Sequence, residues 1–372
     1  MKYMPSRLKT KVFQFVNPFI RLPTMGLDIS DRTIKYLRFL QVKDKIRFDL
    51  FGEIEIPEGI IINGEIQKEA DLVKIFSGWL AREGRKTRSS FMVVSLPEEK
   101  SYVRLLQLPK IKREDIRGAI RWEIEANIPV PIDELIYDYE IIEQSVAWNE
   151  DHIDVLVTAF PKKIVESYVR VLKSAGIRIS AMELESQAII RAVRRRHADN
   201  LVRAVADVGR NKIGLTIISA GAIVFTTTVD LGGNTFDTNI SRALDISLEE
   251  AVKIKMEIGL KKTAYEGKIW GALAPALSVF ADQIRRASEY YQGYVEHAHN
   301  AEIKVAEVIL TGGNANLDGL EMHLSSILKI PVRRGNPFES FGEKMIPAIP
   351  PMPKNKSLAY STAIGLALRG II

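Results

Sequence analysis

The sequence predicts an α/β fold made of two related halves that face each other across a cleft. Two segments carry this prediction, 26–35 (GLDISDRTIK) and 205–214 (VADVGRNKIG). Each is an apolar strand that reaches an aspartate, turns through polar residues and resumes as an apolar strand. At 372 residues the chain is long enough for two or more domains, so we expect one α/β unit to occur twice.

The first half begins with three predicted strands, 24–29, 33–40 and 47–56, which short polar turns connect. A helix follows, which Gly84 ends, and the apolar run at 90–96 predicts a strand that is buried on both faces. The helix is predicted from apolar residues that recur on one face: Leu72, Ile75, Phe76, Trp79 and Leu80.

Residues 99–177 have the predicted order strand, helix, strand, strand and a further helix, which indicates an inserted subdomain. The first helix, 113–127, has Ile116, Ile120 and Ile124 on one face, and a proline-containing break at 128–131 ends it. The other predicted elements are the strands 101–108, 135–143 and 153–160 and the helix 162–175, which Gly176 ends.

The second half repeats the plan of the first after a strand at 177–182 and a helix at 185–196. A capping box beginning at Ser247 predicts a helix that runs to about residue 258. The remaining predicted elements are the strands 203–208, 213–218, 222–229, 308–311 and 331–333, the helices 277–297, 320–328 and 357–368, and a proline-rich loop at 335–357.

The composition narrows the class of protein. The apolar share of 46% and the charged share of 26% are those of a globular protein, and no run of eighteen apolar residues predicts a membrane span. The absence of cysteine excludes disulfides and cysteine metal sites. Since the basic residues behind the net charge of +6 are mostly interspersed with acidic ones, we expect no nucleic-acid partner.

A basic amphipathic segment is predicted at residues 1–22, which contain no acidic residue. Its apolar residues fall at helical spacing beside basic ones, an arrangement typical of helices that lie at a membrane surface. We expect residues 1–20 to contact an anionic membrane or a partner; a disordered lead-in and a helix packed on the body are the alternatives. The apolar stripe consists of Leu8, Val12, Phe15 and Val16, and Arg7, Lys9 and Lys11 flank it.

In their order along the chain, four segments resemble the actin/Hsp70/hexokinase superfamily. Residues 26–35 and 207–214 match its two phosphate loops, 310–320 (LTGGNANLDGL) its adenosine motif, and 359–366 (AYSTAIGL) its closing helix. The resemblance implies an actin-like fold, in which two ribonuclease-H-like α/β domains face a nucleotide cleft.

Within that superfamily the chain resembles the type IV pilus assembly protein PilM family, which is related to the cell-division protein FtsA. The closer match lies at 93–109, 120–134, 243–255 and 284–294. The implied organisation is a first α/β domain at 23–98 and 178–202, an inserted SHS2-type subdomain at 99–177, a second α/β domain at 203–240 and 302–372, and a helical subdomain at 241–301.

The resemblance implies that ATP or ADP with Mg²⁺ binds in the cleft. Asp28 and Asp207 would hold the Mg²⁺ through water, because this ion keeps much of its hydration shell. Lys255 is implied to approach the base or ribose, and the two glycines of the adenosine motif to lie flat against the nucleoside. The implied nucleotide-binding residues are Asp28, Ser30, Lys35, Asp207, Gly209, Arg210, Lys255, Gly312, Gly313 and Asn314.

Several positions depart from the superfamily pattern. Ser30 replaces a glycine of the first phosphate loop, Asn211 and Gly214 replace a hydroxyl residue and an acid of the second, and Val252 replaces a glutamate of the adenosine helix. Because such losses weaken binding, we expect weak or absent hydrolysis. In the alternative interpretation Asp28 and Asp207 are only turn formers.

The family resemblance implies a cytoplasmic scaffold, peripheral at the inner membrane, that binds the N-terminal tail of a PilN-like inner-membrane protein and other pilus assembly proteins. Strand addition in a groove at the inserted subdomain would suit an extended tail. The candidate residues for this contact are Leu105, Leu106, Ile120 and Trp122, although Trp122 is also a candidate for the core.

Two other classes of protein are alternatives to this one. An FtsA-like membrane-associated cytoskeletal protein is the main alternative, and a homo-oligomer or filament stays open; the expected C-terminal amphipathic helix is missing after 369–372. A small-molecule kinase would need a general-base aspartate beside an acceptor pocket, which the sequence pattern does not place.

Overall fold

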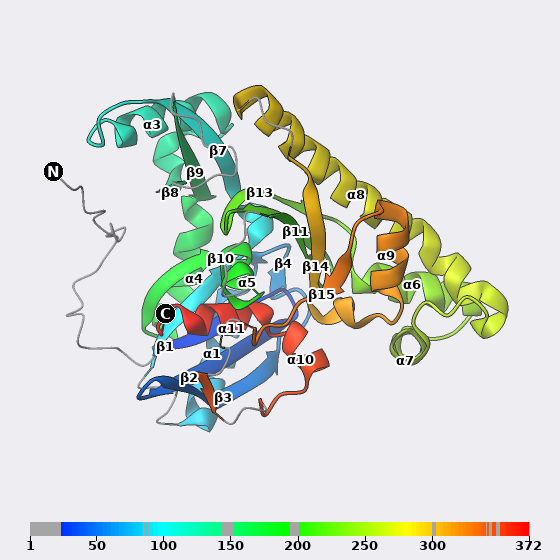
Figure 1. Ribbon diagram of the computed structural model, residues 1–372. Coiled ribbons are helices and arrows are strands. Elements are labelled where there is room, and N and C mark those ends of the chain that lie inside the picture. The colour runs from blue at the N-terminus through cyan, green and yellow to red at the C-terminus, as the bar shows by residue number, and fades with distance from the viewer. Residues whose placement is uncertain are drawn as a thin grey trace.

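The computed structural model describes residues 24–84, 87, 90–142, 152–193, 201–299, 303–339, 341, 344–346 and 350–371. It shows two α/β halves and a smaller lobe that stands on the first half (Figure 1). The basic amphipathic segment predicted at residues 1–22 lies outside the described residues, so its contacts stay a prediction.

The first half is built on a mixed sheet in which β1 pairs antiparallel with β2 and parallel with β6. Glycine at position 26 lets α11 (Ser361–Leu368) cross β1 closely, because a Cβ atom there would lie 2.7 Å from the Ala367 nitrogen. The strand order is β10 (Ile179–Leu184), β6 (Phe91–Leu96), β1 (Thr24–Ile29), β2 (Thr33–Val42), β3 (Lys45–Glu55) and β16 (Met345–Ile346).

The second half repeats this arrangement, with β11 antiparallel to β12 and parallel to β14. Its order matches β3-β2-β1-β6-β10 of the first half strand for strand, which confirms the predicted duplication. The strands are β13 (Ala222–Val229), β12 (Ile213–Ser219), β11 (Val202–Val208), β14 (Val305–Thr311) and β15 (Val332–Arg334).

The smaller lobe is the inserted strand-helix-strand-strand unit, and its sheet has the order β7-β9-β8. It has a core of its own, to which α3 contributes Ile116, Ile120 and Ile124. The further helix, α4 (Lys162–Ser174), packs against α1 (Glu69–Glu83) of the first half, so it does not belong to this core. The unit comprises β7 (Tyr102–Pro109), α3 (Ile116–Asn127), β8 (Leu135–Ile141) and β9 (His152–Pro161).

The end of the chain corrects one predicted boundary, which placed all of 302–372 in the second half. β16 pairs with β3, and α11 packs on β1 and α5 (Glu185–Val193), so both belong to the first half. The physical reason is the apolar character of α11, whose eight residues are all buried and need a core on every side.

Two helices of the second half differ from the prediction. No helix was predicted between the strand at 222–229 and the helix that begins at Ser247, yet α6 (Gly233–Leu244) lies there with Gly232 as its N-cap, and a side chain at Gly232 or Gly233 would strike its neighbours. α8 (Lys268–His299) begins nine residues before the predicted helix 277–297. The helix therefore includes Pro275, which lies on its exposed side. The other helices are α7 (Leu248–Ile258), α9 (Leu320–Leu328) and α10 (Lys354–Leu358).

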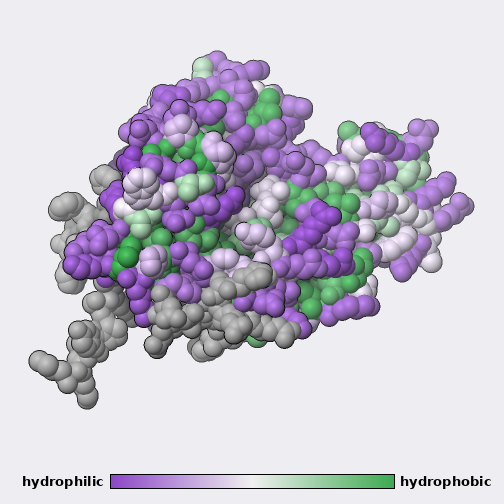
Figure 2. Space-filling view, turned by 90° about the horizontal axis from the view of Figure 1, so that it is seen from above, coloured by the Kyte–Doolittle hydropathy of each residue, from purple (hydrophilic) through white to green (hydrophobic). Residues whose placement is uncertain are grey.

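The face of the molecule from which the inserted unit projects is largely hydrophilic, and its hydrophobic residues form separate groups (Figure 2). Within the described part of the chain, no helix combines the length and the hydrophobicity that a bilayer crossing requires.

Candidate functional site

A cavity of about 320 Å³ lies between the two halves, and both aspartate-containing turns line it. The arrangement confirms that the segments after Ile29 and Val208 face one shared cleft. Nine of the ten predicted nucleotide-binding residues line this cavity: Asp28, Ser30, Lys35, Asp207, Gly209, Arg210, Gly312, Gly313 and Asn314.

The first turn is closed by main-chain and hydroxyl hydrogen bonds of its own, and its Asp31 carboxylate accepts from the nitrogens of Asn63 (3.0 Å) and Gly64 (2.9 Å). The Ser30 nitrogen donates to the Thr33 carbonyl at 2.9 Å, and the Ser30 hydroxyl donates to the same carbonyl at 3.0 Å. Ser30 does not have a positive φ, so a serine adopts this backbone without strain where the superfamily has glycine. Lys35 reaches the cavity edge and donates to the Thr33 hydroxyl at 3.0 Å.

The second turn is held from outside by α6. The nitrogens of Gly233 and Asn234 donate to the carbonyls of Gly209 (3.1 Å) and Arg210 (2.8 Å). In a trans peptide the N–H points away from the carbonyl, so the N–H groups of Arg210 and Asn211 point away from α6, on the side of the cavity. Consecutive N–H groups on one side of a turn form a concave anion site.

The two glycines of the adenosine motif differ in how much space surrounds them: a side chain would clash at Gly312 but not at Gly313. Gly312 has a φ of +85°, and a Cβ atom there would strike Asp207 and lie 2.7 Å from the Val208 carbonyl oxygen. The glycine is therefore required by the protein's own packing, which the prediction of a nucleoside contact did not include. At Gly313 the nearest atom to an added Cβ is the Ala359 Cβ at 3.7 Å, so this position has room.

Lys255 is the exception among the predicted residues. It is 4% exposed and does not line the cavity; its Nζ atom forms an ion pair with Asp237 at 2.7 Å. The same atom donates to Asn314 Oδ1 at 2.9 Å. The prediction that Lys255 approaches the base or ribose is therefore not met, because α6 and Asn314 lie around its ammonium group.

Four carboxyl groups around the cleft have raised pKa values because their removal from water disfavours the charged form: Glu98, which is buried, and Asp28, Glu185 and Asp207, which are half-buried. Burial and the neighbouring Asp28 raise the pKa of Asp207 to about 7. The charge of Lys35 acts in the opposite direction on Asp28 and Asp207. Such a set of hard oxygen donors fits a divalent cation, which would stabilise the ionised carboxylates.

Among the described residues, no three carboxylate or histidine side chains converge with metal-ligand geometry. The binding of Mg²⁺ by Asp28 and Asp207 through water therefore stays a prediction.

Sequence reasoning missed the glutamates of the cleft. Glu98 and Glu99 follow β6, and Glu185 follows β10, so all three lie beyond the carboxyl ends of neighbouring parallel strands. That edge is where ligands bind in α/β sheets, and this rule could have found them. A half-buried glutamate with a raised pKa, such as Glu185, is also the type of group that accepts a proton from water.

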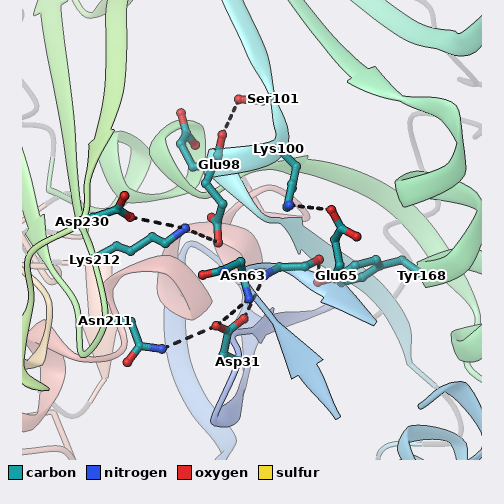
Figure 3. A network of polar contacts seen from close by, with 12 residues as sticks. Asp31, Asn63, Glu65, Glu98, Lys100, Ser101, Tyr168, Asn211, Lys212 and Asp230 are labelled. Carbon is teal, nitrogen blue, oxygen red and sulfur yellow. Dashed lines mark hydrogen bonds and ion pairs between the residues drawn. The ribbon is translucent and has the colours of Figure 1, made fainter. Parts of the chain in front are cut away.

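A polar network joins the cleft to the inserted unit at η1 (Glu98–Lys100) (Figure 3). Lys212 of the second turn lies 3.5 Å from a carboxylate oxygen of Glu99 and 3.8 Å from one of Asp230. Lys100 pairs with Glu65 of the first half at 2.6 Å. The segment that leads into β7 therefore contacts both halves.

The four candidate residues for a partner tail differ in access. Ile120 is fully buried in the core of the inserted unit, so its prediction as a surface contact is corrected. Trp122 is 75% exposed and is not a core residue. Leu105 and Leu106 on β7 are half-buried.

A second cavity, of about 380 Å³, lies between β7 and β13. Val103 and Arg104 line it from β7, and the residues 226–228 line it from β13. Glu98, Glu99 and Lys212 line both cavities.

Comparisons with known proteins agree with this architecture. The family model of the type IV pilus assembly protein PilM matches residues 26–371. A solved PilM–PilN type IV pilus biogenesis complex has a chain that is 22% identical, with a TM-score of 0.77 over 95% of this chain and 100% of that one. The ethanolamine utilization protein EutJ from Carboxydothermus hydrogenoformans is 15% identical, with a TM-score of 0.53 over 95% of this chain and 92% of that one.

Curated relatives are cell division proteins FtsA. That of Neisseria meningitidis serogroup B is 22% identical over 69% of this chain, and that of Bacillus subtilis is 27% identical over 40%. The matches span 66% and 36% of the length of these two relatives. With the family model covering nearly all of the described fold, the chain belongs to the type IV pilus assembly protein PilM family.

Proposed function

We propose that this protein is a cytoplasmic scaffold of the type IV pilus machinery that binds the cytoplasmic tail of a PilN-like inner-membrane protein. The supporting observation is the inserted unit, whose edge strand β7 lies beside the second cavity. A solved structure with a similar fold, with a TM-score of 0.77 over 95% of this chain, is a PilM–PilN complex.

The tail site that we propose is the cavity between β7 and β13. Both are edge strands, so each has main-chain groups that a further strand does not occupy within its own sheet. An extended peptide that enters here would pair with the edge of β7 while its side chains meet Val103 and the threonines 226–228.

The test uses a fluorescent peptide that copies the cytoplasmic tail of a PilN-like protein from the same organism. Thr227→Trp fills the cavity with a residue that strands accept, and it should weaken the anisotropy-measured affinity by about tenfold or more. Trp122→Ala on the exposed face of α3 is the matched control and should bind as wild type. The opposite pattern would place the tail on α3 and contradict the proposed site.

We also propose that ATP or ADP with Mg²⁺ occupies the cleft, that Asp28 and Asp207 hold the ion through water, and that hydrolysis is slow. The N–H groups of the second turn, Lys35 and the carboxylates of the cleft support this proposal. A solved actin-like neighbour, MreB5 of Spiroplasma citri, is described as bound to ADP; it is 13% identical, with a TM-score of 0.51 over 87% of this chain and 94% of that one.

Bound nucleotide can be detected directly. Heat denaturation of the purified protein should release ADP or ATP, which anion exchange with absorbance at 260 nm identifies. Phosphate release should be far slower than ordinary enzyme turnover, which is about 1–1,000 per second. A protein that carries no nucleotide and gains no thermal stability from Mg-ATP would act as a scaffold alone.

A filament-forming cytoskeletal protein is the second candidate, because the curated relatives are FtsA proteins. Sedimentation with and without ATP separates the two functions: large pelleting assemblies favour the filament. Removal of residues 1–20 tests the proposed membrane contact, since binding to anionic vesicles should fall with the loss of this basic segment.

A further inference from the structure

Lys255 is a buried cation directly behind the second turn. Besides its ion pair with Asp237, its ammonium group donates to Asn314 Oδ1 and lies 3.4 Å from the Gly233 carbonyl oxygen. Asn314 lines the cleft, whereas Lys255 does not. The lysine is therefore one side chain removed from any ligand in the cavity.

Asn314 carries the influence of Lys255 to the turn. Its amide oxygen faces Lys255, and its amide nitrogen donates to the Gly209 carbonyl at 2.9 Å. An ammonium group only donates hydrogen bonds, so the Asn314 amide must direct its oxygen, and not its nitrogen, at Lys255. The orientation that satisfies Lys255 is the one that directs the donor at Gly209.

The Gly209 carbonyl consequently receives two hydrogen bonds, from Asn314 and from the Gly233 nitrogen. Both hold this carbonyl toward Asn314 and the beginning of α6. Because the peptide is planar and trans, the same two bonds direct the Arg210 N–H away from them, and both residues of this peptide line the cavity.

We propose that Lys255 is a positioning residue for phosphate: without touching the nucleotide, it orients Asn314, which fixes the Gly209–Arg210 peptide with its N–H directed into the cleft. This inference rests on the nucleotide binding proposed above. It assigns to Lys255 a role in recognition of the phosphate groups and none in recognition of the adenosine.

The test measures magnesium pyrophosphate and magnesium ADP separately by titration calorimetry, with wild type and Lys255→Met. We expect both ligands to lose about tenfold or more in affinity and by the same factor, because the loss lies in the phosphate site. A loss for ADP together with unchanged pyrophosphate binding would show that Lys255 contacts the adenosine, and it would overturn the inference.

A double-mutant cycle gives a second test. Asn314→Ala removes the donor to Gly209, so adding Lys255→Met to it should cost no further pyrophosphate affinity. If the two substitutions lower the pyrophosphate affinity independently and additively, Lys255 does not act through Asn314, and the inference is contradicted. The cycle also keeps the test valid where Lys255→Met alone folds poorly, since Asn314→Ala must by itself weaken pyrophosphate binding.

Arg203→Met is the matched control for stability. Arg203 pairs with the half-buried Glu307 at 2.5 Å in the same half, at the end of β11 remote from Asp207. The Arg203→Met variant should have a lower melting temperature than wild type and the same pyrophosphate affinity. If wild type binds neither ligand, the proposed nucleotide function fails and the inference falls with it. If wild type binds and both Lys255→Met and Asn314→Ala bind equally well, the inference alone fails.

Discussion

The two halves of this protein share a strand order and the main-chain hydrogen bond that closes each cleft turn, but neighbouring segments reach the two turns differently. The Ser30 nitrogen donates to the Thr33 carbonyl at 2.9 Å, and the Gly209 nitrogen donates to the Lys212 carbonyl at 3.0 Å. In the first half, the Asp31 carboxylate accepts the outside hydrogen bonds, from the nitrogens of Asn63 (3.0 Å) and Gly64 (2.9 Å). In the second half, the carbonyls of Gly209 and Arg210 receive hydrogen bonds from the beginning of α6 and from Asn314.

The difference shows that duplication preserves topology more strictly than it preserves local support. A turn whose side-chain carboxylate accepts the outside hydrogen bonds keeps the neighbouring backbone at a side chain's length, whereas a turn whose main-chain carbonyls accept them brings that backbone close and needs glycines there. Gly232, Gly233 and Gly312 all lie within 3 Å of a neighbour at the position a Cβ would occupy. We therefore expect substitutions around the second turn to be the more damaging.

The largest expected effect is that of Gly312→Ala. The positive φ and the clash with Asp207 and Val208 should lower the free energy of unfolding by about 3 kcal/mol or more. Gly313→Ala is the matched control, and it should change stability by less than about 1 kcal/mol because this site has room. Urea denaturation of both variants checks the prediction, and equal losses would contradict it.

A smaller effect is expected at Gly209. A Cβ atom there would lie 2.8 Å from the Lys212 carbonyl oxygen, so Gly209→Ala should cost about 1–3 kcal/mol of stability. Ser30→Ala, at the corresponding place in the first turn, removes exposed hydroxyl contacts with Thr33 and should cost about 0.5–1 kcal/mol. Thermal unfolding of the two variants sharpens the comparison; a costlier Ser30→Ala would reverse it.

Glu98 accepts hydrogen bonds from Ser186 of the first half and Thr226 of the second, so the pH dependence of stability reports on this contact between the halves. Burial raises its pKa above the ordinary value of 4.5, so the folded protein binds this proton more tightly than the unfolded chain does. Its contribution to stability is therefore fully present below the unfolded pKa and is lost as pH rises through the folded pKa.

Glu98→Gln should remove that part of the pH dependence. The free energy of unfolding, measured at about pH 5 and about pH 7.5, should fall less with rising pH in the variant than in wild type. Identical slopes would show that Glu98 titrates alike in the folded and unfolded states. Lys100→Met, which breaks a pair of the same segment with Glu65, serves as the control and should leave the slope unchanged.

The smallest expected effect is on ligand affinity, in Ser30→Gly, which restores the superfamily glycine. The variant loses the hydroxyl bonds with Thr33 and adds flexibility to the unfolded chain, so stability should fall by about 1–2 kcal/mol, while the absence of a positive φ at this position means that glycine opens no new backbone conformation for the ligand. Mg-ADP affinity, measured by calorimetry, should not rise. A clear gain in affinity would mean that the serine obstructs the phosphate.

Much of the fold could be predicted from local pattern. Strands of alternating or continuous apolar residues, the capping box at Ser247 and the glycine that ends α1 each depend on neighbouring residues, and the structure confirms them. The helix α6 was missed because glycine is a poor helix former, and the reason for Gly232 and Gly233 at its beginning is a close approach by residues distant in sequence.

The sequence by itself determined that two aspartate-containing turns exist and that each follows a buried strand, because strand periodicity and turn chemistry are local properties. Only the tertiary structure decided the partners of Lys255, the packing of α11 on the first half and the gathering of Glu98 and Glu185 at the cleft. These depend on segments that are far apart in the chain, and whether a side chain contacts a ligand or another side chain is settled only when those segments pack together.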